Sequence, residues 1–104
     1  MDRSIRPWTA DLPQAVTLEH DLPRHEYDAE RVRLTFENGY TASIIRGPYT
    51  YGGPAGLFEI AVIEPDGFLA GVFEGEWGDS VLGHLSTDEV VEWVKKIAAM
   101  PTVL

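Results

Sequence analysis

The 104-residue sequence contains no cysteine, few basic residues and no long apolar run. Without cysteine, the chain has no disulfides, no thiolate metal ligands and no cysteine nucleophile. Eight lysines and arginines stand against 17 aspartates and glutamates, which gives a formal net charge of -9. A field of that sign repels phosphate backbones and anionic lipids, so it disfavours direct binding of nucleic acid or membrane surfaces. It favours a partner with a basic surface.

Targeting signals and repeats are also missing from the sequence. No apolar stretch is long enough to span a bilayer, and no basic-then-apolar leader opens the chain, so we expect a cytoplasmic protein. The length suits one domain, which we place over residues 30–104. Residues 1–29 contain three prolines and no sustained period, which predicts an extended or irregular arm. Five apolar residues of this arm are candidates to anchor it: Trp8, Leu12, Val16, Leu18 and Leu22.

The pattern over residues 31–46 predicts a β-hairpin. Apolar residues alternate with polar ones through 31–36, the period of a half-buried strand. Asn38-Gly39 follows, the strongest short signal for a hairpin turn. If these two residues form the whole loop, Leu34 lies opposite Ser43 and Val32 opposite Ile45. One face of the hairpin would then hold Val32, Leu34, Phe36 and Ile45, and the other Arg33, Thr35, Tyr40, Ala42 and Ile44.

Two further strands and a helix complete the predicted fold. Residues 57–63 are apolar on both faces except at Glu59, which predicts a central strand, and residues 68–73 predict a fourth strand. Ser86 and Glu89 have capping-box spacing at the start of a helix that ends before Pro101. We therefore expect an α+β fold: an antiparallel sheet of about four strands, with the C-terminal helix packed on one face. The apolar stripe of this helix contains Val90, Val91, Val94, Ile97 and Ala98.

The glycine-rich loop over residues 47–56 is the first candidate site. A phosphate cradle needs glycines that lead into a helix, usually with a lysine nearby. Here the loop leads into a strand and has no lysine, so we do not expect a phosphate site. Tyr49 and Tyr51 suggest a protein-contacting loop, because tyrosine gives rigid amphipathic contact area. The alternative is a tyrosine pair packed over the sheet edge.

The second candidate is the acidic stretch around Trp77. If the indole is exposed, it would make a contact point for a basic surface. If it belongs to the core, the acids form a solvated rim around it, and the sequence leaves both interpretations open. The residues concerned are Glu74, Glu76, Trp77 and Asp79.

Other chemistry-bearing residues do not predict a metal, a cofactor or a catalytic centre. His20 and His25 are five residues apart with a proline between them, which does not match the spacing of a zinc-binding helix. His84 has no identifiable catalytic partner, so we expect a structural role. Glu59 is expected to pair with Arg33 or Arg46, because a buried carboxylate is costly alone.

Two segments resemble small uncharacterised proteins of bacteriophages and prophages, including actinobacterial ones. The segments are ENGYTASIIRGPYTYGGPAGLFEIAVIEPDG and VLGHLSTDEVVEWVKKIA, and the resemblance covers about residues 31–98. It implies a phage accessory protein that modulates the host or counters its defences, and no catalytic residues carry over.

We therefore expect a non-enzymatic protein that binds a host protein through an acidic surface, including inhibition of a defence effector. One alternative is a structural or virion-associated module that self-associates as a homo-oligomer. The other is a small enzyme or ligand-binding domain.

Overall fold

The computed structural model describes residues 15–50, 52–64, 67–68 and 81–101. These residues form six strands and one α-helix, with a 3-10 turn at Gly53–Ala55. In chain order the elements are β1 (Thr17–Asp21), β2 (Glu30–Thr35), β3 (Thr41–Arg46), β4 (Phe58–Glu64), β5 (Gly67–Phe68), β6 (Val81–Leu85) and α2 (Thr87–Ala98).

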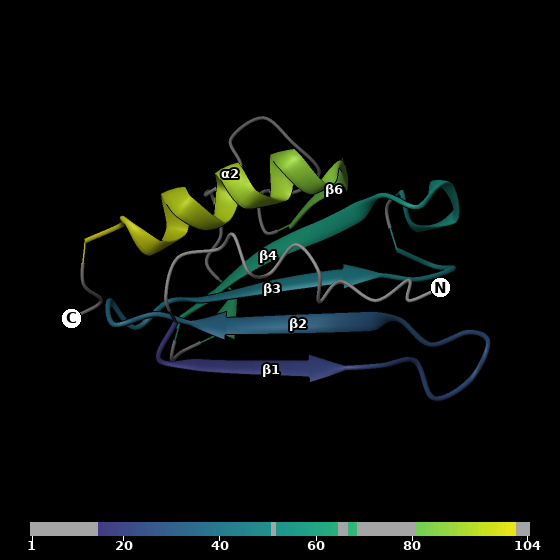
Figure 1. The fold of residues 1–104 in the computed structure, drawn as a ribbon, viewed down its shortest axis with the longest axis horizontal. Coiled ribbons are helices and arrows are strands. Elements are labelled where there is room, and N and C mark those ends of the chain that lie inside the picture. The colour runs from purple at the N-terminus through teal and green to yellow at the C-terminus, as the bar shows by residue number, and fades with distance from the viewer. Residues whose placement is uncertain (1–14, 51, 65–66, 69–80, 102–104) are drawn as a thin grey trace.

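All described strand pairs are antiparallel, and β1 to β4 follow one another across the sheet (Figure 1). The far edge of β4 is shared, because β6 pairs with its first half and β5 with its last two residues. The sheet thus has five strand positions. Helix α2 packs mainly against β3, β4 and β6, and β1 lies at the edge of the sheet that is farthest from the helix. The α+β prediction and the central place of residues 57–63 are confirmed.

The predicted number of about four strands is wrong, and β1 accounts for the difference. It lies within residues 1–29, which the prolines led us to expect as an arm, yet it pairs with β2 along its whole length. Its alternation of apolar and polar residues suits a strand, and the prolines flank it. The predicted strand at 68–73 falls mostly outside the described residues. Strand β6 begins at Val81 and pairs with β4.

The hairpin between β2 and β3 has a register one residue away from the predicted one. Phe36 N donates to Tyr40 O at 2.9 Å, so the loop has three residues, with Gly39 at φ 92°. A glycine in the left-handed region is typical of such three-residue loops. Leu34 therefore lies opposite Ala42, and Val32 lies opposite Ile44. Ala42 and Ile44 are fully buried on the core face, and the prediction that Ile45 occupies that face is wrong.

Asn38 explains why this turn has its shape. Its side chain is buried and donates from Nδ2 to the carbonyls of Ile97 at 2.8 Å and Met100 at 3.1 Å. Its Oδ1 accepts from the backbone N–H of Tyr40 at 3.0 Å. The last carbonyls of a helix have no partner within the helix. The hairpin turn thus supplies the hydrogen bonds that end α2, and it joins the helix to the sheet.

The start of α2 is the predicted capping box. Glu89 N donates to Ser86 Oγ at 3.3 Å, and Ser86 N donates to Glu89 Oε1 at 3.0 Å. The bond that the Ser86 backbone N–H donates to the Glu89 carboxylate is the largest cause that lowers the pKa of this carboxyl, and a side-chain bond from Ser86 lowers it further. Val90, Val94 and Ile97 are the buried residues of the predicted stripe. They complete a core whose other buried members include Val32, Leu34, Phe36, Ile44, Phe58, Ile60, Val62 and Leu85.

No helix in the described part of the chain has the length and apolar character needed to cross a membrane.

Candidate functional site

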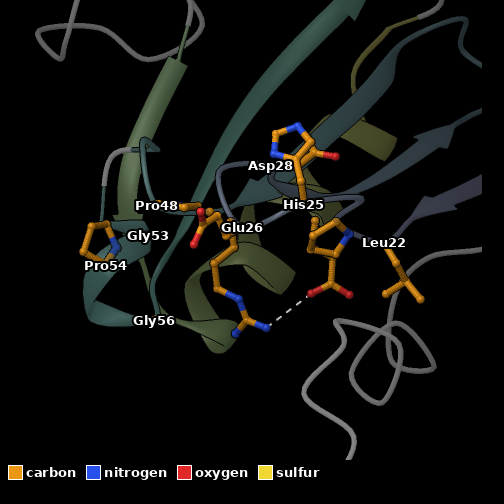
Figure 2. Close-up of a pocket in the computed structure, with 12 residues that line it drawn as sticks. Leu22, His25, Glu26, Asp28, Pro48, Gly53, Pro54 and Gly56 are labelled. Atoms are coloured by element: carbon orange, nitrogen blue, oxygen red, sulfur yellow. Dashed lines mark hydrogen bonds and ion pairs between the residues drawn. The ribbon is translucent and has the colours of Figure 1, made fainter.

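Two loops at one end of the sheet enclose a groove of about 830 Å³. One loop connects β1 to β2 over residues 22–29, and the other connects β3 to β4 over residues 47–57. Figure 2 shows Leu22 on one side of the groove and Pro54 and Gly56 on the other. The groove is therefore built from the glycine-rich loop that the sequence singled out and from a loop that it did not.

Backbone and side-chain bonds hold the β3–β4 loop in shape. Thr50 Oγ1 donates to Gly47 O and accepts from Gly47 N, each at 3.0 Å. Gly53 folds back on the same residue so closely that a Cβ on it would overlap the Gly47 carbonyl oxygen. A Cβ on Gly47 would lie 2.8 Å from the Cα of Ala29 in the other loop. These glycines let two backbones approach each other, as expected for glycine at close contacts.

The β1–β2 loop is held by Asp28. Its carboxylate accepts from the backbone N–H of Arg24 at 3.0 Å and from that of Ala29 at 2.9 Å. The bond from Arg24 is the largest cause that lowers the Asp28 pKa, followed by the bond from Ala29. Asp28 therefore stays anionic at neutral pH and lies in the groove beside His25 and Glu26 (Figure 2).

A buried ion-pair network lies beneath the groove. Glu30 on β2 is 5% exposed; its Oε2 lies 2.8 Å from His20 Nε2, and its Oε1 lies 3.3 Å from Arg46 Nη2. The dashed line in Figure 2 marks the pair with Arg46. The Arg46 guanidinium carbon also lies 4.7 Å from the ring centroid of Phe58, a cation–π contact. One carboxylate thus links β1, β2 and β3.

Exposed aromatic side chains lie on the same two loops. The rings of Tyr27 and Tyr49 are 6.0 Å apart between centroids, with an interplanar angle of 30°. Tyr27 is 59% exposed and Tyr49 is 79% exposed. The ring of His25 lies 6.5 Å from that of Tyr27. The groove is lined by the carboxylates of Glu26 and Asp28 and by the ion pair of Glu30 with Arg46. The exposed tyrosine pair lies on the same two loops, next to residues that line the groove.

Among the predicted contact residues, Tyr49 is the one that the structure describes. The alternative of a tyrosine pair packed over the sheet edge does not fit the exposure of Tyr49. The contact of Tyr49 with Tyr27 was not predicted. Tyr51 and the acidic stretch (Glu74, Glu76, Trp77 and Asp79) lie outside the described residues. His20 is part of the network with Glu30, and within the described ranges no three histidine or acidic side chains gather as metal ligands do.

Glu59 lies on the sheet face away from α2, because its neighbours Phe58 and Ile60 point into the core. It lines a cavity of about 130 Å³ together with Arg31 and Arg33. Arg46, the other expected partner of Glu59, binds Glu30 across the β2–β3 register.

Comparison with known proteins gives one partial similarity and no family. The chain is 40% identical over 47 residues to endo-1,6-beta-D-glucanase BGN16.3 of Trichoderma harzianum. The match covers 45% of this chain but only 10% of the glucanase. No family model matches the chain, and no solved structure matches it.

Proposed function

We propose that this protein acts by binding a basic segment of another protein, and not by catalysis. The observation that carries the proposal is the exposed pair Tyr27 and Tyr49 beside a groove lined by the carboxylates of Glu26 and Asp28. Exposed tyrosines give contact area at low cost in side-chain entropy. The carboxylates and the net charge of -9 favour a cationic partner, and arginine fits best because its planar guanidinium also stacks on aromatic rings.

The resemblance to bacteriophage and prophage proteins supports a host protein as the partner, bound in the host cytoplasm. An acidic surface of this kind would occupy a basic, nucleic-acid-binding cleft, and so inhibit a host defence effector. Residues Tyr51, Glu74, Glu76, Trp77 and Asp79 extend the proposed contact surface on sequence grounds.

Affinity capture from host lysate tests the proposal. We expect a partner that is captured at low salt and released at higher salt, because salt screens the attraction between opposite charges. We also expect no capture of this partner when Tyr27 and Tyr49 are both replaced by serine. Glu92→Ala is the matched control, because its side chain is 68% exposed on α2 and does not line the groove. A partner captured equally by the double variant would overturn the assignment of the site.

The partial match to a glucanase favours a second candidate, binding of β-1,6-linked glucan at the tyrosine pair. Migration through a gel that contains soluble β-1,6-glucan distinguishes the two. Retardation that Tyr49→Ala abolishes would favour the glucan, and unchanged migration would remove this candidate. Release of reducing ends from the same glucan would show catalysis and contradict the non-enzymatic proposal.

A further inference from the structure

The outer edge of β1 is the second surface of interest. In the part of the chain that the structure describes, β1 pairs with β2 on one side only. The N–H and C=O groups on the other side of an edge strand are a template for a further strand. Natural edges are often blocked by proline or by charged side chains, lysine above all. Thr17–Asp21 contains no proline or lysine, and its two charged residues, Glu19 and Asp21, are both acidic, so they oppose an acidic strand but not a basic one.

One face of this strand and of its flanking residues carries exposed apolar side chains on either side of His20. Leu18 lies opposite the buried Leu34, so it belongs to the face that α2 covers elsewhere. Because α2 packs mainly on β3, β4 and β6, the helix leaves this edge uncovered. Val16 is 62% exposed, Leu18 53% and Leu22 57%. These three side chains were expected to anchor an arm to the core, and the structure leaves more than half of each exposed.

The other face of β1 is acidic, and the residues of β2 that lie opposite its acids are basic. Glu19 lies opposite Arg33, and Asp21 lies opposite Arg31. On the apolar face, Leu18 meets Leu34 in the same register. Opposite charges across a strand pair stabilise it, and like charges destabilise it. A strand that fits the outer edge as β2 fits the inner edge therefore alternates basic and apolar residues.

We propose that β1 receives an extended segment of the partner, which joins the sheet as a strand of alternating basic and apolar residues. This inference rests on the proposed function, since it names the form of the basic segment. A second copy of this chain fits less well, because two β1 strands would bring their acidic residues together. Leu22 follows β1 and lines the groove, so the added strand and the groove form one continuous surface.

Two six-residue peptides of equal composition test the proposal. RVRVRV has the required alternation, and RRRVVV has the same charge without it. We expect RVRVRV to bind about tenfold more tightly by fluorescence anisotropy, a difference of one decade in Kd. We also expect hydrogen exchange to slow at the β1 amides when it binds. Equal affinity of the two peptides would overturn strand addition.

Variants of the chain separate the edge from the groove. Leu18→Lys puts a charged side chain on the face where the peptide valines would pack, and we expect it to remove the preference for RVRVRV. Leu18→Gln should weaken binding less, and circular dichroism confirms that both variants fold. Tyr49→Ala should weaken binding of both peptides alike and keep the preference for RVRVRV over RRRVVV, so failure of the groove proposal and failure of the edge proposal give different results. Self-association of the protein without peptide, lost in Leu18→Lys, would overturn the proposal in favour of a second copy.

Discussion

Replacement of Asn38 should be among the most damaging single changes at a turn in this protein. Asn38→Ala removes the hydrogen bonds to the carbonyls of Ile97 and Met100 and the bond from Tyr40 N. A hydrogen bond contributes about 0.5–1.5 kcal/mol net, and more where a buried partner is left unpaired. Some of the freed carbonyls can reach water, so we expect a loss of about 2–3 kcal/mol. That is a large share of the 5–15 kcal/mol, roughly, that holds a domain folded.

Asn38→Asp provides a sharper comparison. Its carboxylate keeps the acceptor for Tyr40 N but has no N–H to donate, and it places a negative charge at the negative end of the helix dipole. At pH 7 we therefore expect Asn38→Asp to unfold at a lower urea concentration than Asn38→Ala. Glu37→Ala, at the exposed neighbouring turn position, is the control and should change stability by no more than about 0.5 kcal/mol. Equal unfolding midpoints for Asn38→Ala and Glu37→Ala would refute the role given to Asn38.

Three further predictions concern the other polar contacts. Glu30→Ala should lower the free energy of urea unfolding by about 2–3 kcal/mol. This loss is smaller than the usual cost of breaking a buried ion pair, because the Arg46 side chain is partly exposed. Glu30→Gln should lower the free energy of unfolding by less than Glu30→Ala. Ser86→Ala should cost about 1 kcal/mol in thermal unfolding and reduce protection of the first turn of α2. Folding lowers the pKa of the Asp28 carboxyl. Asp28 therefore stabilises the folded protein above the pKa that it has in the unfolded chain, and this stabilisation is lost as pH falls through its pKa in the folded protein. Wild type should therefore be more stable than Asp28→Asn at neutral pH, and the difference should vanish in acid; a difference that persists there would contradict this cause.

Local sequence signals were enough to predict the fold class. The errors in the prediction arose where the structure depends on contacts between residues far apart in the chain. The capping box and the stripe of α2 depend on neighbours within one helix, so the sequence alone indicates them. The hairpin register depends on Asn38, whose partners are about sixty residues away. For β1, the signal was present: residues 16–22 read VTLEHDL, an alternation of apolar and polar positions interrupted only at His20. The flanking prolines obscured it, although proline outside a strand does not prevent one.

The sequence indicated one of the two loops that form the candidate site. Tyr49 and the glycine-rich loop stood out by composition. Their counterpart loop did not, because Tyr27 and Asp28 come next to the β3–β4 loop only when β2 and β3 pair. The network of Glu30 likewise joins residues from three strands, so no spacing in one segment could reveal it.

The affinity of the protein for octa-arginine compared with octa-lysine tests the central claim most directly. Both peptides carry the same charge, so attraction to the acidic chain alone predicts similar binding. If a basic segment contacts the tyrosine pair, octa-arginine should bind several-fold more tightly, because the guanidinium stacks on tyrosine and the ammonium is more strongly hydrated. The double change of Tyr27 and Tyr49 to alanine should remove that preference and leave the salt-sensitive part. Equal affinities in the wild-type protein would contradict the proposed site.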